Sequence, residues 1–118
     1  MYKGMIVDDA AIMRMRLREI LDPQFDIISE AGDGEQALKN YEKANPDFVT
    51  LDITMPKMNG IDTLKTLIEK YPDAKVVIVS AVGQKKLVFE ALATGAKDFI
   101  VKPFDPERVR QSINRLFE

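Results

Sequence analysis

Short apolar runs and longer segments with helical periodicity alternate along this chain. The runs are rich in β-branched or aromatic residues and occupy positions 5–7, 25–28, 48–51, 76–79 and 99–101. Most of them are apolar throughout, which is typical of strands that are buried on both faces of a sheet. The pattern therefore predicts five strands.

The segments between and after the runs have apolar residues spaced close to 3.6 positions apart, which predicts five helices. Turn and cap residues mark several ends: Asp33 is a candidate N-cap, and Pro72 stops the third helix. Gly95 suits the position after a helix, and Pro106 suits a first helical turn. The apolar positions of the five helices are Ile12, Met15, Ile20 and Leu21; Ala37, Leu38 and Tyr41; Ile61, Leu64, Leu67 and Ile68; Leu87, Val88, Ala91 and Leu92; and Val109, Ile113, Leu116 and Phe117.

The strict alternation of strand and helix predicts a doubly wound α/β fold. Parallel strands joined by right-handed crossovers place helices on both faces of one sheet. In such sheets, binding sites form outside the carboxyl ends of the strands. The second run ends in residues 29–32, which are less distinctive and expected at the sheet edge.

Polar side chains with strong chemistry follow the other four runs. The first run ends in Asp8 and Asp9, the third in Asp52, the fourth in Ser80 and the fifth in Lys102. Any one of them could simply mark where a strand leaves the core. Together they would bring three carboxylates, a hydroxyl and an ammonium group to one edge of the sheet.

Composition narrows the classes of function. The chain has 118 residues, enough for one domain, with 46% hydrophobic and 31% charged residues and a net charge of −2. That charge argues against nucleic acid as a partner, and no apolar run is long enough to insert in a membrane, so a cytoplasmic protein is expected. There is no cysteine and no histidine, so chemistry that needs an imidazole must take it from another molecule.

Three neighbouring carboxylates need a cation or strongly shifted pKa values. Oxygen ligands alone favour a hard ion, Mg²⁺ in the cell, with Mn²⁺ as a substitute. A divalent ion, an ammonium group and a hydroxyl suit the oxygens of a transferred phosphoryl group. Asp52 stands alone at the end of a central strand, which makes it the candidate nucleophile, while Asp8 and Asp9 are placed to hold the metal.

Four motifs carry a resemblance to a known family. VDDAAIMR, LDITMPKMNG, VSAVG and KDFIVKPF are spaced as in receiver domains of bacterial two-component response regulators, over essentially the whole chain. The chain resembles most closely the stand-alone chemotaxis members. The resemblance implies a (βα)5 flavodoxin-like sheet with strand order 2-1-3-4-5 and a single receiver domain over residues 1–118 without an effector domain.

The resemblance also implies roles for the site residues. Asp52 corresponds to the phosphoacceptor, Asp9 to a direct metal ligand and Asp8 to a residue that holds metal-bound water. The backbone carbonyl of Thr54 completes the implied ligands. Some relatives have Asn at the position of Thr54, so its effect on dephosphorylation is an open question.

Four positions near the end of the sheet complete the comparison with the family. Lys102 corresponds to the lysine that pairs with the phosphoryl group, and Ser80 to the switch hydroxyl. Phe99 corresponds to the aromatic residue that changes rotamer, although many relatives have Tyr there. Pro103 follows a peptide bond that is commonly cis in the family.

The expected function is a phosphorylation switch that is not an enzyme in its own right. A histidine kinase of the chemotaxis type would donate the phosphoryl group to Asp52. The monomer would then signal through a surface formed by the fourth helix, fifth strand and fifth helix. The implied partners are a flagellar motor switch protein and a phosphatase.

Three alternatives remain open at this point. The chain could be a receiver of a phosphorelay outside chemotaxis. A phosphatase of the haloacid dehalogenase type also uses an Asp nucleophile and Mg²⁺, but its acidic pair comes late in the chain, and it commonly has a second Asp where Thr54 stands here. A flavodoxin-like flavin-binding module would have its phosphate repelled by Asp8 and Asp9.

Overall fold

The computed structural model describes residues 1–54 and 59–118, so residues 55–58 of the LDITMPKMNG motif lie outside the described residues. Strands and helices alternate along the described chain, as the hydrophobic pattern predicts. The elements are β1 (Lys3–Val7), α1 (Ala11–Leu21), β2 (Asp26–Ala31), α2 (Gly34–Ala44), β3 (Phe48–Asp52), α3 (Gly60–Lys70), β4 (Val76–Ala81), α4 (Lys85–Thr94), β5 (Asp98–Lys102) and α5 (Pro106–Arg115).

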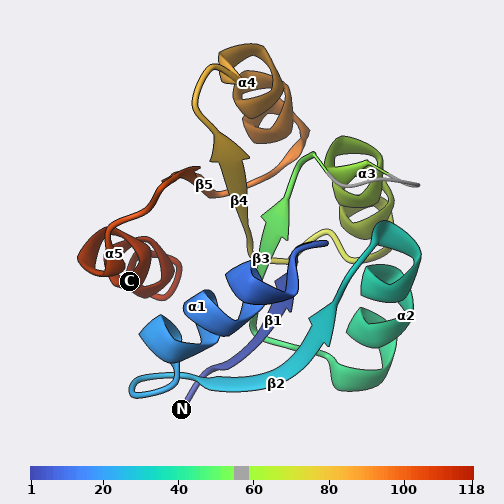
Figure 1. Cartoon of the computed structure of the whole chain (residues 1–118). Coiled ribbons are helices and arrows are strands. Elements are labelled where there is room, and N and C mark those ends of the chain that lie inside the picture. The colour runs from blue at the N-terminus through green and yellow to red at the C-terminus, as the bar shows by residue number, and fades with distance from the viewer. Residues whose placement is uncertain (55–58) are drawn as a thin grey trace.

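The five strands form one parallel sheet in the order β2-β1-β3-β4-β5, which confirms the predicted topology. Figure 1 shows the strands fanning across the middle of the molecule with their carboxyl ends at one edge. Asp52 pairs with Val79, so Ser80 lies one position beyond it on the neighbouring strand. Lys102 pairs with Ala81 at the end of β5.

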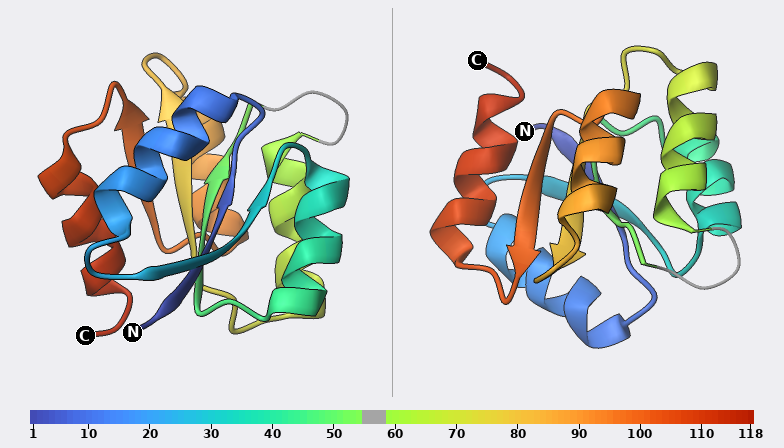
Figure 2. Two further views of the ribbon diagram at one scale, coloured as in Figure 1. Left: turned by 60° about the horizontal axis from the view of Figure 1, so that its bottom comes forward. Right: turned by 90° about the horizontal axis from the view of Figure 1, so that it is seen from above.

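Helices cover both faces of the sheet and enclose two hydrophobic cores. One core lies under α1 and α5, and the other lies under α2, α3 and α4. The two views in Figure 2 show these groups on opposite sides of the strands. Every residue of β3 is buried, as expected for the central strand of a doubly wound sheet.

The end signals in the sequence correspond to observed helix ends. The Asp33 carboxylate accepts a hydrogen bond from the Gln36 N–H at the start of α2. Gly95 has a φ of 134° at the end of α4, a conformation that L side chains rarely adopt. Pro106 opens α5 after an Asp105 N-cap, where its missing N–H costs nothing.

Helix α1 differs from the expected apolar stripe. Its buried residues are Leu17, Ile20 and Leu21, so the helix packs on the sheet through its second half. Ile12 and Met15 in the first half are 55% and 50% exposed. The 3.6-residue spacing predicted the helix correctly but did not distinguish its covered part from its exposed part.

Strands β2 and β4 extend beyond the apolar runs that predict them. They end at Ala31 and Ala81. The hydrogen bonds between strands join backbone groups, so the pairing continues past the apolar run at residues with polar side chains, such as Glu30 and Ser80. None of the helices described is long and apolar enough to cross a membrane.

Candidate functional site

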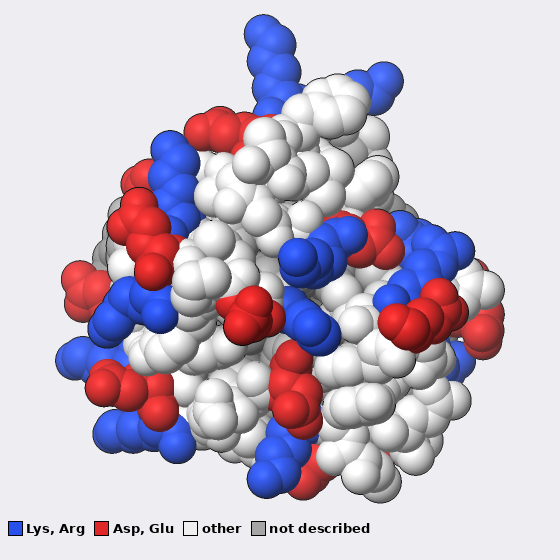
Figure 3. All heavy atoms as spheres, turned by 180° about the vertical axis from the view of Figure 1, so that it is seen from behind, with Lys and Arg blue, Asp and Glu red and all other residues white. Residues whose placement is uncertain are grey.

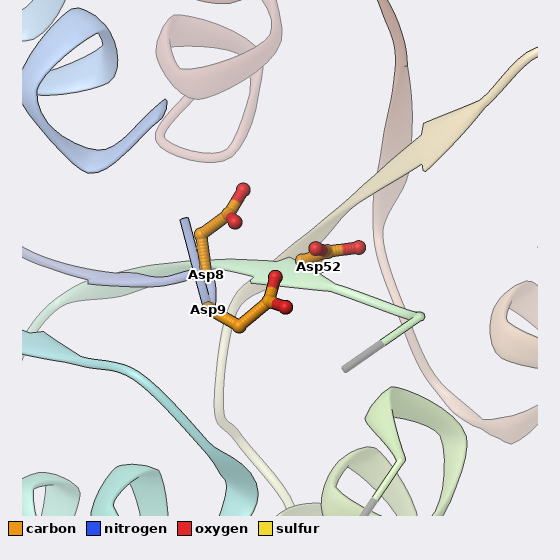
Figure 4. A group of neighbouring side chains, drawn as sticks. All are labelled: Asp8, Asp9 and Asp52. Carbon is orange, nitrogen blue, oxygen red and sulfur yellow. The ribbon is translucent and has the colours of Figure 1, made fainter. Parts of the chain in front are cut away.

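The carboxyl ends of β1 and β3 bring three carboxylates together. Asp8 and Asp9 follow β1, and Asp52 ends β3; one oxygen from each lies within 4.8 Å of the others. Figure 4 shows the three side chains gathered at these strand ends. Asp8 and Asp52 are buried, and Asp9 is exposed to solvent. Solvent therefore reaches the cluster at Asp9.

Lys102 reaches this cluster from the end of β5. Its Nζ donates a hydrogen bond to Asp8 Oδ2 at 3.0 Å and lies 3.6 Å from Asp52 Oδ2. Burial by itself would lower the pKa of Lys102. The hydrogen bond to Asp8 and the negative charge of Asp52 outweigh that effect, so the pKa of Lys102 is raised and the group is an ammonium ion.

Asp8 is the most enclosed member of the cluster. Its backbone N–H donates to the Ala31 carbonyl of β2 at 3.0 Å, and its Oδ1 accepts from the Ala10 N–H at 2.9 Å. Burial raises the pKa of Asp8, and the negative charge of Asp52 acts in the same direction. The hydrogen bonds from Ala10 and Lys102 oppose this rise but do not cancel it.

Asp52 is held by Thr54, two positions after it. The Thr54 backbone N–H and the Thr54 hydroxyl each donate to Asp52 Oδ1 at 3.0 Å. Gly60, at the start of α3, comes so close that a Cβ there would collide with the backbone of Asp52 and Ile53. One oxygen of Asp52 is thus fixed by Thr54, and the other faces Lys102.

Ser80 and Phe99 line one apolar cavity of about 430 Å³ between β4, α4 and β5. Ser80 is 1% exposed, and its hydroxyl has no hydrogen-bond partner among the described residues. A buried hydroxyl without a partner is unfavourable and is expected to have an explanation. Phe99 is partly buried and packs against the core under α2, α3 and α4.

The predicted site residues lie at the carboxyl end of the sheet or next to it, except for Phe99, which lies near the start of β5 and meets Ser80 only along the shared cavity. The Lys102–Pro103 peptide bond is cis, the form expected from the resemblance. Thr54 contacts Asp52 through its N–H and hydroxyl, whereas the sequence prediction concerned its carbonyl.

Two charged networks escaped the sequence analysis. At the start of β5, Arg108 donates two hydrogen bonds to the Asp98 carboxylate and a third to the Phe99 carbonyl. Beside the site, Glu30 at the end of β2 pairs with Arg14 and Arg18 of α1. The spacing of Arg14 and Arg18 places them on one helix face, and that was the only signal in the sequence.

The donor set fits a hard divalent cation. Three carboxylates converge on one point, and the chain has no histidine or cysteine that would favour a softer metal. Lys102 supplies one positive charge to the cluster, so a second cation would relieve the remaining repulsion.

The surface behind the sheet carries charges of both signs. Figure 3 shows basic and acidic side chains interspersed on the face opposite to that of Figure 1, with uncharged surface between them. Two large apolar side chains are exposed at α4 and just before it: Val82 is 76% and Phe89 is 68% exposed. These two residues also line the cavity that contains Ser80 and Phe99.

The sequence of the chain is similar to those of known chemotaxis proteins. The chain is 49% identical over 113 residues to the chemotaxis protein CheY of Thermotoga maritima, covering 95% of this chain and 94% of that protein. It is 47% identical over 115 residues to the chemotaxis protein CheY of Bacillus subtilis, covering 97% and 96%.

A solved structure shows the same fold. The crystal structure of the CheX-CheY-BeF3-Mg complex from Borrelia burgdorferi contains a chain that matches with a TM-score of 0.94 and 42% identity, covering 99% of this chain and 90% of that one. A model of the response regulator receiver domain matches residues 5–114. The chain therefore belongs to the family of response regulator receiver domains.

Proposed function

We propose that this protein is a phosphoryl-accepting switch of two-component signalling that works in chemotaxis, and that residues 1–118 form a single receiver domain. The observation that carries the proposal is the convergence of Asp8, Asp9 and Asp52 with Lys102 at the carboxyl end of the sheet. The CheY relatives support the assignment to chemotaxis rather than to another phosphorelay.

Asp52 is the proposed nucleophile. A carboxylate oxygen of Asp52 attacks the phosphorus of a phosphohistidine on a partner kinase, forming a P–O bond as the P–N bond breaks. The departing imidazole of the kinase takes a proton from solvent, and Asp52 becomes an acyl phosphate. Thr54 holds Asp52 Oδ1 at 3.0 Å, so the oxygen facing Lys102 is the one free to attack.

Lys102 is the proposed partner of the phosphoryl group. Its Nζ is 3.6 Å from Asp52 Oδ2 and remains charged, because its pKa is raised. A fixed ammonium group stabilises the charge on the phosphoryl oxygens during transfer. Lys102 would exchange part of its contact with Asp8 for contact with the incoming group.

Asp8, Asp9, Asp52 and the carbonyl of Thr54 are the proposed residues that hold Mg²⁺, with Mn²⁺ as a substitute. When bound, the ion neutralises negative charge on the carboxylates and the phosphoryl oxygens. The Borrelia burgdorferi complex, which contains BeF3 and Mg, supports Mg²⁺ as the ion.

Ser80 and Phe99 are the proposed switch. The unpartnered hydroxyl of Ser80 gains an acceptor when Asp52 carries a phosphoryl group, so it would turn toward that group. Phe99 lines the same cavity and would move into the space that Ser80 leaves. The surface of α4, β5 and α5 would thereby change shape and affinity for partners.

The proposed partners follow from this surface and from the relatives. They are a chemotaxis histidine kinase, a flagellar motor switch protein and a phosphatase. The Borrelia burgdorferi structure, a complex of CheX and CheY, supports a protein partner in chemotaxis signalling. Exposed Val82 and Phe89 provide apolar contact area for such a partner.

The direct test of the proposal is phosphorylation by a small acyl-phosphate donor in the presence of Mg²⁺. Intact-mass measurement should show one added phosphoryl group on the wild-type protein and on Asp73→Asn, a control for an exposed carboxylate. Asp52→Asn should show none. An unmodified wild type, or an equal adduct on Asp52→Asn, would contradict the proposal.

A turnover assay separates the switch from the phosphatase alternative. A receiver should form its aspartyl phosphate without sustained hydrolysis of a phosphate ester such as p-nitrophenyl phosphate. Steady hydrolysis over many turnovers that depends on Asp52 would support the phosphatase instead.

A further inference from the structure

Arg14, Glu30 and Arg18 form a chain of ion pairs beside the turn that joins β1 to α1. Arg14 Nε donates to Glu30 Oε1 at 3.1 Å, and Arg18 Nε donates to Glu30 Oε2 at 2.8 Å. The Asn40 side-chain amide donates to the Glu30 carbonyl at 2.9 Å. The two arginines thus share one carboxylate whose own backbone is anchored to α2.

The guanidinium group of Arg14 also contacts the candidate metal site. Its Nη1 donates to the backbone carbonyl of Asp8 at 2.6 Å. The Asp8 N–H is already bonded to the Ala31 carbonyl of β2, so both backbone groups of Asp8 have partners. One of these partners belongs to the sheet, and the other is a side chain that belongs to α1.

This contact fixes the peptide between Asp8 and Asp9. The Asp8 carbonyl belongs to that peptide, so the bond from Arg14 determines how the peptide is oriented after the strand has ended. The orientation of the peptide in turn sets the directions in which the Asp8 and Asp9 side chains leave the backbone. Arg14 can hold the peptide because Glu30 fixes the guanidinium group of Arg14. The Arg14 side chain is 23% exposed.

We propose that Arg14, anchored by Glu30, is a positioning residue that prepares Asp8 and Asp9 to bind Mg²⁺ together with Asp52. The inference rests on the proposed function, since it concerns the same metal site. Among the described residues, no hydrogen bond or ion pair joins Arg14 to the carboxylate oxygens of Asp8, Asp9 or Asp52; its contact with this cluster is through the Asp8 backbone carbonyl. Residues that orient metal ligands in this way typically change metal affinity by about 10- to 100-fold when replaced.

The charge of Arg14 would act in the opposite direction. A positive charge near the cluster repels a divalent cation, so removing it should tighten binding if charge were its main effect. Glu30 and its bonds to Arg14 reduce that repulsion. The sign of the change in Mg²⁺ affinity therefore distinguishes positioning from electrostatics.

Calorimetric titration of the unphosphorylated protein with MgCl₂ tests the proposal, using Arg14→Gln and Arg14→Lys. Positioning predicts that both variants bind Mg²⁺ about tenfold more weakly, because neither side chain can bond Glu30 and the Asp8 carbonyl with the same fork. The matched control is Arg115→Gln, which removes an exposed arginine at the end of α5. It should bind like the wild type.

Three results would overturn the positioning role. Tighter binding by Arg14→Gln with unchanged binding by Arg14→Lys would assign the effect to charge. Unchanged affinity in both variants with a lower unfolding temperature would assign Arg14 to stability alone. A wild type that binds no Mg²⁺ would overturn the proposed function as well, so the two failures are distinguishable.

Amide chemical shifts provide a second readout that does not depend on heat of binding. In the metal-free state, Arg14→Gln should shift the backbone amide resonances of Asp9 and Ala10 while leaving those of β4 and β5 in place. Unperturbed resonances in the Asp8–Ala10 turn would show that Arg14 does not set its geometry, and would also overturn the proposal.

Discussion

Asp8 and Asp98 are carboxylates at opposite ends of the same sheet, and their surroundings differ. Asp98 begins β5 and accepts hydrogen bonds from both terminal nitrogens of Arg108, from the Ser112 hydroxyl and from the Phe99 N–H. Asp8 follows β1, where it receives one ammonium group and one backbone N–H and faces two further carboxylates.

The pKa values of the two groups shift in opposite directions. Burial would raise the pKa of Asp98, but the bonds from Arg108 and Ser112 outweigh it, so the pKa of Asp98 is lowered. Burial raises the pKa of Asp8 despite Lys102. Asp98 has enough donors to stabilise its charge, whereas Asp8 lacks them.

The difference separates an ion pair that is balanced within the protein from a cluster of charges that is not. The Asp98 network joins β5 to α5 and is complete in the protein alone. The Asp8 cluster is incomplete without another cation, and such unbalanced groups cluster at functional sites. We therefore expect the buried charges of the Asp8 cluster to lower the free energy of unfolding, in contrast to the Asp98 network.

Replacing Asp98 should have the largest effect on stability. Asp98→Ala leaves the buried Ser112 hydroxyl and the Arg108 guanidinium without their carboxylate, and we expect a loss of about 2 kcal/mol. Urea unfolding at neutral pH measures it, with Asp73→Ala as the control for an exposed carboxylate. A loss no greater than that of the control would show that the network does not stabilise the fold.

The same variant has a defined pH dependence. Because the pKa of Asp98 is below its usual value of 3.8 in the folded protein, its contribution is present above pH 3.8 and is lost as the pH falls through the lowered pKa. The difference between Asp98→Ala and the wild type should therefore shrink in strong acid. A constant difference would contradict the assignment of the stability to the charged form.

Replacing Asp8 should have a smaller effect of opposite sign. Asp8→Asn removes a buried charge and its repulsion from Asp52, and without Mg²⁺ we expect a gain of about 1 kcal/mol at neutral pH. Thermal unfolding with and without Mg²⁺ measures the gain, and Mg²⁺ should stabilise the variant less than the wild type. A loss of stability without Mg²⁺ would mean that the contact with Lys102 outweighs burial.

The pH dependence of this gain is also defined. The pKa of Asp8 is raised above its usual value of 3.8, so its contribution to stability is fully present below pH 3.8 and is lost as the pH rises through the folded pKa. The advantage of Asp8→Asn should therefore appear as the pH rises and disappear in acid. The opposite trend would contradict the direction of the shift.

Two buried serines give the smallest and most closely matched comparison. Ser112 and Ser80 are 0% and 1% exposed, but only the Ser112 hydroxyl has a partner. Ser112→Ala should cost about 1 kcal/mol, because it removes a hydrogen bond to a charged group, whereas Ser80→Ala should be close to neutral. Urea unfolding of the unphosphorylated protein measures both changes in stability. Equal losses would show that the hydrogen bond of Ser112 does not distinguish it from Ser80.

The sequence by itself determined the fold and which polar side chains lie together at the carboxyl end of the sheet. Short apolar runs that alternate with segments of 3.6-residue periodicity determined the order of strands and helices, because strands inside the sheet are buried on both faces and each helix is buried on one. Polar residues that directly follow apolar runs, such as Asp52 and Lys102, could be assigned to one edge, because parallel strands end on the same side.

Only the tertiary structure decided which charges are balanced. Glu30 looked undistinguished at the end of an edge strand, and Asp98 preceded an apolar run without a visible partner. Their arginines come from helices and lie 10 to 16 positions away along the chain, so no local spacing reveals the pairs. The tertiary structure also decided that Ile12 and Met15 are exposed. The helical period shows which face of a helix is apolar, but it does not show where the sheet beneath that face ends.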